Sequence, residues 1–329
     1  MPRYLLLTSA AVLAALLSAC GGGGGGDSAV PVTTPVTPAS SGVQEDTAAF
    51  QLLNAERLRC GFGTLTRNAS LDAAAKAHAD YQAFYGIVDH LENAAARPVG
   101  FTGTSPIDRV LAKGYAARAA DIGGVADEIT ALLGTASKTG LGESGIRSLL
   151  NAPYHLRGLM SGYRDVGLAV RSSTDVGSTQ LSVYLQINAA YLTTAGQQLP
   201  AATELRTYPC EGTTGVNFRL SNESPNPVIG RDLAVNPLGS SVYVALSPGR
   251  RLVVSSAVFT QISTGQVVAT RAPVGAANDP HQDSFDVHEA YIAADAPMLP
   301  GTAYRVSLAG TNNGVAFTRQ FSFTTGAGG

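Results

Sequence analysis

Histidine is the residue type best suited to carry chemistry in this chain of 329 residues, which contains five of them. Three, His78, His90 and His155, lie in the amino-terminal half, where the apolar pattern is mostly helical. A neutral imidazole can ligate a metal ion or act as a general base. No local spacing, such as a His-Glu pair on one helix face, brings two of these groups together. Only the tertiary fold could assemble them into a site.

The local sequence predicts different surroundings for two of these histidines. His78 lies on the apolar stripe of a helix predicted to begin at Ser70 and end at Gly86. This favours a core imidazole bonded to a neighbouring carbonyl over a role in a cavity. His155 falls in the first turn of a helix that begins near Pro153. Because the helix dipole disfavours an imidazolium there, we expect a neutral ring.

The rest of the sequence offers one further cluster of ionisable groups and no serine-nucleophile motif. Six ionisable groups crowd into residues 279–289, namely Asp279, His281, Asp283, Asp286, His288 and Glu289. Their spacing fits no calcium loop, so a solvated loop is the favoured interpretation over a calcium or zinc site. No Gly-x-Ser-x-Gly elbow precedes a predicted helix, which leaves a serine hydrolase without positive support.

The first 19 residues predict an export signal. Arg3 precedes an apolar run from Tyr4 to Leu17, which is too short for an ordinary spanning helix and is followed by glycines. Leu17-Ser18-Ala19-Cys20 resembles the bacterial lipobox, in which the cysteine becomes the lipidated first residue. Cys20 is therefore expected to bind the membrane through acyl chains, and cleavage that leaves a free thiol is the alternative. Residues 20–43 are rich in Gly, Ser, Thr and Pro and predict a flexible tether.

The remaining cysteines, Cys60 and Cys210, form an even pair in an oxidising compartment and predict a disulfide, with two separately buried thiols as the alternative. The formal charge of −2 and the absence of a basic run exclude the electrostatic footprint of a nucleic-acid-binding protein.

The order of elements predicts an α+β protein with two domains, 44–200 and 211–329. Helices are expected at 46–59, 70–86, 106–113, 125–133, 145–150 and from 153 onward, with strands at 165–170 and 180–189. Helices followed by a small sheet indicate a mixed, largely antiparallel sandwich. Beyond Cys210, short strands are expected at 241–246, 251–259, 266–270, 304–308 and 316–325, with a hairpin at 311–314. These predict a β-sandwich.

Several passages of the first domain carry a resemblance to one family. They are Leu53-Asn54-Ala55-Glu56-Arg57, 71–79 around His78, Val88-Asp89-His90, Arg109, Gly114-Tyr115, Asp127-Glu128-Ile129, 151–157 around His155, and Asp165-Val166-Gly167-Leu168. In order and spacing they resemble the CAP superfamily (cysteine-rich secretory, antigen 5, pathogenesis-related 1) in its bacterial form, over residues 48–190. The resemblance implies an α-β-α sandwich. The stretch from Pro297 to Gly310 with Phe321 to Thr325 resembles bacterial Ig-like modules.

The CAP resemblance also implies a cavity lined by two histidines and two glutamates, which holds a divalent metal in some members. His90, Glu128 and His155 correspond to three of these groups. Ile129 stands where the family has asparagine, and Asn151 occupies the region that supplies the second glutamate. Two imidazoles and one carboxylate would suit zinc with an open position, and a solvated polar cavity is the alternative.

Three functions are compatible with these features. The first is a non-enzymatic module that binds a lipid, glycan or peptide of the cell envelope. The second is a hydrolase in which His155 or Glu128 acts as general base, through a zinc-bound water or without one. The third is an adhesin or spacer that acts through the Ig-like half. Gly21 lacks the aspartate of inner-membrane retention, so the expected location is the outer membrane, facing the periplasm or the exterior.

Overall fold

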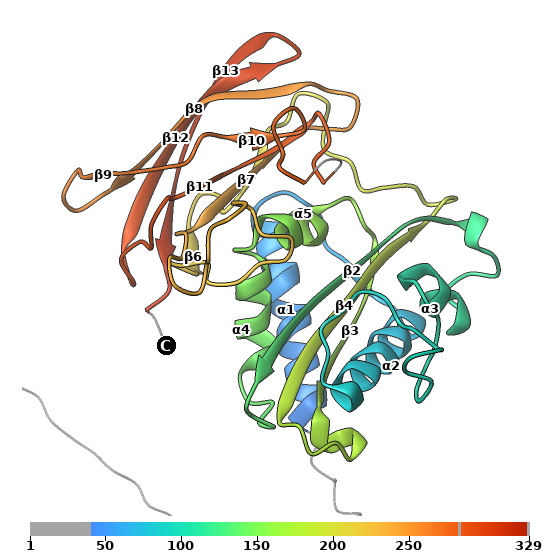
Figure 1. Cartoon of the computed structure of the whole chain (residues 1–329). Coiled ribbons are helices and arrows are strands. Elements are labelled where there is room, and N and C mark those ends of the chain that lie inside the picture. Colours follow the sequence, from blue (N-terminus) through green and yellow to red (C-terminus); the bar gives the residue numbers. More distant parts are fainter. Residues whose placement is uncertain (1–40, 282–283, 328–329) are drawn as a thin grey trace, which may run out of the picture. The chain divides into compact units, whose positions relative to one another are not determined.

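The computed structural model describes residues 41–281 and 284–327, with side chains from residue 44 onward (Figure 1). The predicted signal sequence, Cys20 and the tether up to residue 40 lie outside these residues. Helix α1 spans Ser41–Arg59, so it begins within the predicted tether and earlier than the expected residue 46. No helix within the described ranges is both long and apolar enough to cross a membrane.

A four-stranded sheet organises the amino-terminal half. Its order is β1-β3-β4-β2, with β1–β3 parallel and the other two pairings antiparallel. The strands are β1 (Thr66–Arg67), β3 (Asp165–Ser172), β4 (Ser182–Leu192) and β2 (Ile122–Leu133). Strand β2 is therefore an edge strand, paired along its length with β4.

The identity of β2 corrects the prediction of a helix at 125–133. The segment contains good helix formers, but all nine of its residues pair with β4, and this pairing overrides their weak local preference. The sequence Asp127-Glu128-Ile129-Thr130 alternates between the two faces of the sheet, as the two-residue period of a strand requires.

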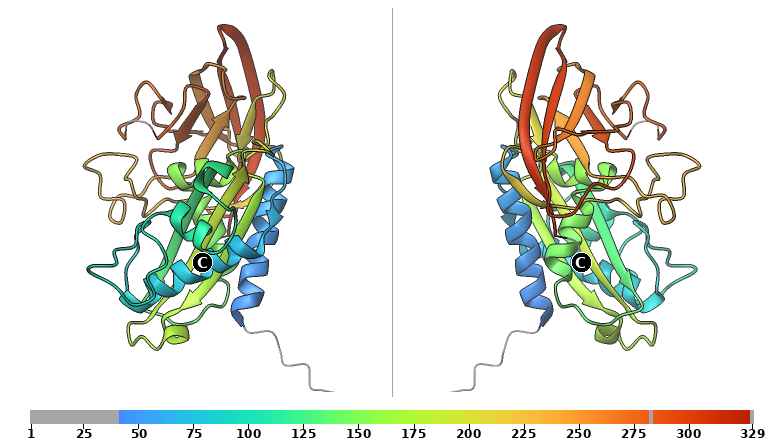
Figure 2. Two further views of the ribbon diagram at one scale, coloured as in Figure 1. Left: turned by 90° about the vertical axis from the view of Figure 1, so that its right-hand side faces the viewer. Right: turned by 90° about the vertical axis from the view of Figure 1, so that its left-hand side faces the viewer.

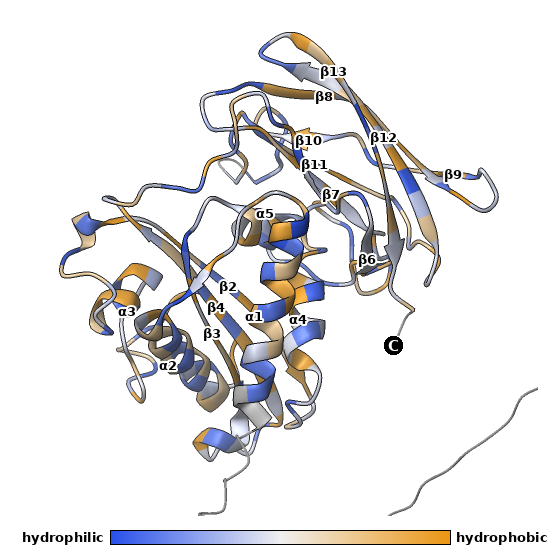
Figure 3. Ribbon diagram, turned by 180° about the vertical axis from the view of Figure 1, so that it is seen from behind, coloured by the Kyte–Doolittle hydropathy of each residue, from blue (hydrophilic) through white to orange (hydrophobic). Residues whose placement is uncertain are grey.

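Helices cover both faces of this sheet (Figure 2). Val166, Leu168 and Val170 of β3 pack with α1, α4 (Leu141–Leu149) and α5 (Pro153–Met160). On the other face, Ala169 of β3 packs with the alanines of α2 (Ala69–Tyr85). Helix α4 carries hydrophobic and hydrophilic residues on different sides, as expected for a helix with one buried side (Figure 3).

Local signals explain the helix ends. Asn68, rather than the predicted Ser70, caps α2, because its side chain accepts hydrogen bonds from the backbone N–H groups of Ser70 and Leu71. Ser105 and Asp108 form a capping box at the start of α3 (Pro106–Ala112). Two 3-10 turns complete this half, η1 (Ala119–Asp121) and η2 (Ser173–Val176).

Two further sheets form the carboxyl-terminal half, as predicted. One has the order β10-β11-β7-β5 and the other β6-β13-β12-β8-β9. All pairings are antiparallel except β13–β6. The strands are β5 (Arg206–Tyr208), β6 (Thr213–Val216), β7 (Ser241–Ala245), β8 (Leu252–Gln261), β9 (Val267–Val268), β10 (Val274–Gly275), β11 (Glu289–Ala293), β12 (Ala303–Asn312) and β13 (Val315–Thr325). The predicted hairpin joins β12 to β13, with Asn313 at φ +49°.

One apolar cluster joins the two halves, and another lies between the two sheets of the carboxyl-terminal half. Val242 and Val244 of β7 pack with Phe259 and Phe321 of the other sheet. On the opposite face of β7, Tyr243 and Ala245 join the cluster that contains α1, α4 and α5. Cys60 and Cys210 form the predicted disulfide between the end of α1 and the residues after β5. The chain is therefore an α+β protein, and its described residues form one compact unit.

The disulfide closes a sequence separation of 150 residues. We expect the double variant Cys60→Ala with Cys210→Ala to lose about 2–5 kcal/mol of unfolding free energy, because the unfolded chain is no longer cross-linked. Urea denaturation without reductant measures this loss. Reductant should lower the midpoint of the parent protein and leave the variant unchanged. Equal midpoints for the two oxidised proteins would contradict a stabilising role.

Candidate functional site

The candidate site lies around the edge of the amino-terminal sheet. Because consecutive residues of a strand point to opposite faces, Asp127 and Glu128 of β2 face different helix layers. On the α2 side, His90 Nδ1 lies 2.9 Å from Asp127 Oδ2. On the α5 side, His155 Nε2 lies 4.0 Å from Glu128 Oε2. The two imidazole rings approach around β2, with 6.3 Å between their centres.

A buried polar network holds the loop that carries His90. His78 is fully buried, and its Nε2 lies 2.9 Å from the carbonyl oxygen of Asp89. This fits the predicted core imidazole, although its Nδ1 also lies 2.9 Å from Glu92 Oε1. The buried guanidinium of Arg109 donates to the carbonyl of His90 and lies 3.2 Å from Asp127 Oδ1. The position of His90 is therefore set by its own backbone contacts and by its carboxylate partner.

His90 is the accessible imidazole of the site, with 46% of its side chain exposed. The hydrogen bond to Asp127 raises the pKa of His90 and outweighs the opposing effect of partial burial. Among the described residues, no hydrogen-bond partner is found for Nε2 of His90, whereas Nδ1 is bound to Asp127. Nε2 of His90 is therefore available to a ligand.

His155 is held between two carboxylates. Its Nδ1 lies 3.1 Å from Glu223 Oε1, and its other nitrogen faces Glu128. Burial lowers the pKa of His155, but the bond to Glu223 and the charges of Glu128 and Glu223 prevail and raise it to about 9. The expected neutral ring is therefore wrong, because two nearby carboxylates outweigh the dipole of an eight-residue helix.

Glu128 lies beneath α5 in close contact with Gly158. A Cβ atom at position 158 would lie 1.7 Å from Glu128 Oε1, so only glycine lets the helix approach the carboxylate. Burial raises the pKa of Glu128 to about 7. Near neutral pH the protonated and the ionised forms of Glu128 are therefore both populated.

Glu223 is the residue of the candidate site that the sequence did not indicate. Its carboxylate also accepts the backbone N–H of Tyr154, so it caps α5 from a loop of the carboxyl-terminal half. Its second oxygen is buried and finds no hydrogen-bond partner in the described part of the chain. Glu223 lies 68 residues after His155 in the segment assigned to the second domain, and no motif marks it.

Asn151 takes a different part in the site from the one expected. Its Nδ2 donates to the carbonyl of Arg219, and its Oδ1 accepts the backbone N–H of Ser241. Both amide atoms therefore hold the second half against the corner between α4 and α5. Asn151 also lines the groove described next, but its polar atoms already bind backbone.

A groove of about 870 Å³ adjoins the two imidazoles. It is lined by the His90 loop, the end of β2, α4 and the corner before α5, the segment 215–224, and residues 326–327. This volume falls within the range of roughly 300–1,000 Å³ that is usual for small-ligand sites. Polar groups from three distant parts of the chain thus converge on one concave surface.

The three predicted zinc ligands do not fit a zinc ion in this arrangement. Zinc binds imidazole nitrogen at roughly 2.0–2.1 Å, so its ligands must converge closely. Within the described ranges, the one group of three potential ligand atoms that lie within 4.8 Å of one another is Asp286, His288 and Glu289. His155 instead uses Nδ1 toward Glu223, and its raised pKa favours a proton on the ring.

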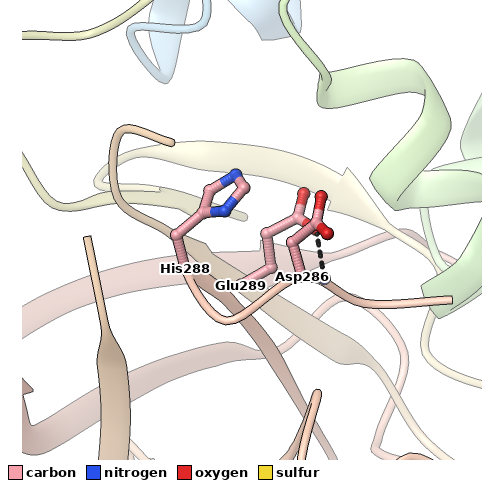
Figure 4. A group of neighbouring side chains, drawn as sticks. All are labelled: Asp286, His288 and Glu289. Carbon is pink, nitrogen blue, oxygen red and sulfur yellow. Dashed lines mark hydrogen bonds between the residues drawn. The ribbon is translucent and has the colours of Figure 1, made fainter. Parts of the chain in front are cut away.

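Figure 4 shows the cluster of Asp286, His288 and Glu289, in which the two carboxylates lie side by side. An arginine binds both of these carboxylates. Arg157 Nε lies 2.8 Å from Glu289 Oε2 and its Nη2 lies 3.0 Å from Asp286 Oδ2. The hydroxyl of Tyr243 donates to the other oxygen of Glu289. Asp279 and Glu289 are both buried, so the predicted solvated loop is wrong for these residues. The acidic groups join the carboxyl-terminal half to α5.

Neither a scan against models of protein families nor a search of curated proteins finds a match for this chain. What the site can bind is therefore inferred from its own residues. It offers one accessible imidazole, one imidazolium held by carboxylates, and one carboxyl group that titrates near neutral pH.

The pairing of His155 with Glu223 predicts a pH dependence. Because the pKa of His155 is raised from 6.5 to about 9, its contribution to stability is complete below about pH 6.5 and is lost as the pH rises through about 9. In Glu223→Gln we expect the midpoint for His155 to fall by about 1–3 pH units, since an opposite charge has been removed. NMR titration of the imidazole measures this midpoint. The exposed Glu204→Gln is the matched control, and an unchanged midpoint in Glu223→Gln would contradict the pairing.

Proposed function

We propose that this chain is a lipid-anchored binding protein of the bacterial cell envelope, whose groove beside His90 and His155 takes a lipid, glycan or peptide ligand. The observation that carries the proposal is that His90, His155 and Glu223 line one groove of ligand size, with Glu128 beside His155. A concave, partly apolar surface with a few convergent polar groups is the usual form of a binding site.

The finer fold belongs to the same proposal. The amino-terminal half is a CAP-type α-β-α sandwich, supported by helices on both faces of its sheet and by one histidine on each side of β2. The carboxyl-terminal half is an Ig-like sandwich, supported by two mainly antiparallel sheets around one core. The export signal and the lipobox-like Leu17-Ser18-Ala19-Cys20 support tethering to a membrane, with the outer membrane as the expected address.

The state of the imidazoles favours binding over catalysis. A general base must be unprotonated at the working pH. His155 is held as an imidazolium by Glu128 and Glu223, so it cannot accept a proton near neutral pH. His90 presents a free nitrogen from a fixed loop, which suits a hydrogen bond to a ligand.

We expect His90→Gln to weaken ligand binding about tenfold, because one hydrogen bond of roughly 1.4 kcal/mol is lost. Calorimetry with peptidoglycan fragments, phospholipid vesicles and peptides would identify the class that binds, and would then compare the parent protein with the variant. His288→Gln is the matched control, since His288 lies outside this groove. Equal affinities for all three proteins would contradict a site at His90.

Hydrolysis is the second candidate, and it is favoured by a single observation, the pKa of about 7 for Glu128. A carboxyl group that titrates near neutral pH is suited to general acid or base catalysis. On ester and peptidoglycan substrates, an enzyme of this kind should lose at least a hundredfold in rate in Glu128→Gln. Equal turnover by the parent protein and the variant would eliminate this candidate.

A further inference from the structure

The groove contains an open edge of β-sheet. Strand β2 is last in the order β1-β3-β4-β2, and its residues from Ile129 to Leu133 line the groove. At about 3.4 Å per residue, this stretch offers an edge roughly 15 Å long. An edge strand presents backbone N–H and C=O groups that can pair with another extended chain.

The hydrogen-bond pattern identifies the residues that face outward. At one end of the pairing, Gly134 N donates to the carbonyl of Leu181, and at the other, Thr193 N donates to the carbonyl of Asp121. Odd-numbered residues of β4 therefore direct their backbone N–H and C=O groups toward β2. This agrees with Ala190 of β4, whose carbonyl accepts from Arg164 on the β3 side.

An antiparallel ladder alternates between bonded and unbonded pairs. Glu128 lies opposite Ile187, so its backbone groups are hydrogen-bonded to β4. Ile129, Ala131 and Leu133 then direct their backbone groups away from β4 and toward the groove. In the described part of the chain, no hydrogen bond joins these outward backbone groups to another residue.

The lining of the groove indicates what could pair with this edge. Val88, Leu132 and Leu133 are large apolar side chains that remain 54%, 46% and 71% exposed. Arg147 and Arg219 also line the groove, and within the described ranges neither forms an ion pair with a carboxylate. Arg147 Nη1 donates to the backbone carbonyls of Thr214 and Gly215. The groove therefore combines a backbone edge with apolar side chains and two guanidinium groups whose charge no carboxylate of the described residues neutralises at ion-pair distance.

We propose that the groove binds an extended peptide of another protein, which adds to the outer edge of β2 as a further strand. The peptide carries apolar side chains at alternate positions and a carboxylate for Arg147 or Arg219. Backbone pairing would supply affinity, and the apolar and charged walls would supply specificity. This inference rests on the proposed function, because it names the ligand class of the same groove.

The test uses the full chain and an array of fluorescent, acetylated heptapeptides that alternate a varied apolar residue with threonine and end in aspartate. Fluorescence polarisation reports binding. Proline at position 131 removes an outward N–H without removing a hydrogen bond to β4, so we expect Ala131→Pro to weaken the strongest peptide at least tenfold. Ala131→Val keeps the N–H and should bind within threefold of the parent. Equal binding by these two variants would overturn the proposal.

A second measurement does not depend on the folding of a variant. Two versions of the strongest peptide carry N-methyl groups on alternate amides, one version for each alternate set. Only the amides that face β2 are needed, so one version should lose at least tenfold in affinity and the other should bind normally. Loss in both versions or in neither would overturn strand addition.

The remaining outcomes separate this inference from the proposed function. Binding of a glycan or lipid that depends on His90, with no peptide bound from the array, would overturn the peptide and leave the binding site. A tenfold gain in peptide affinity after deletion of residues 21–40 would identify the chain's own tether as the occupant and overturn an external partner. Absence of binding by every peptide, glycan and lipid probe would overturn both.

Discussion

The alternation of side chains along one edge strand is the constraint on which the site depends. Asp127 and Glu128 are neighbours in the chain, but the pleat of β2 sends one to each face of the sheet. Asp127 meets His90 from the loop that follows α2, and Glu128 meets His155 of α5. Because β2 has no neighbouring strand beyond it in the sheet order, the two imidazoles can approach each other around the edge. An inner strand would have kept them in separate compartments.

The carboxylates on the two sides of β2 differ in how far neighbouring cations compensate their charge. On the α2 side, Asp127 meets both His90 and the buried guanidinium of Arg109, so its charge is compensated twice. On the α5 side, the carboxylates Glu128 and Glu223 share a single histidine. Desolvation of two carboxylates beside one imidazolium is unfavourable, and the raised pKa of Glu128 is the consequence. The less compensated side is therefore the one that titrates near neutral pH.

Patterns within short stretches of sequence predicted much of this structure. The helix at α2, the strands β3 and β4, the β12–β13 hairpin and the pairing of Cys60 with Cys210 follow from local periodicity, turn residues and cysteine count. The core environment of His78 also followed, because its place on an apolar stripe is a local property. The family resemblance indicated His90, Glu128 and His155, which the fold brings together.

The features of the fold and the site that the sequence did not predict depend on contacts between distant segments. Residues 125–133 have a helical composition, and only their pairing with β4 makes them a strand. The charge of His155 depends on Glu223, which approaches from a loop of the other half. A prediction from helix position alone could not include that carboxylate. For the same reason, Asp279 and Glu289 look like a solvated loop until Tyr154 and Arg157 are placed beside them.

The dependence of His155 on Glu223 has a consequence for the role of the carboxyl-terminal half. The His90 side of the site is complete within the amino-terminal half, since Asp127, Arg109 and His78 all belong to it. The His155 side is not, because Glu223 both caps α5 and sets the charge of the imidazole. Asn151 and Arg157 fix the same junction through Arg219, Ser241 and Glu289. The second half is thus part of the site itself, and a change in how the halves pack would alter the charge of His155 before it altered the position of His90.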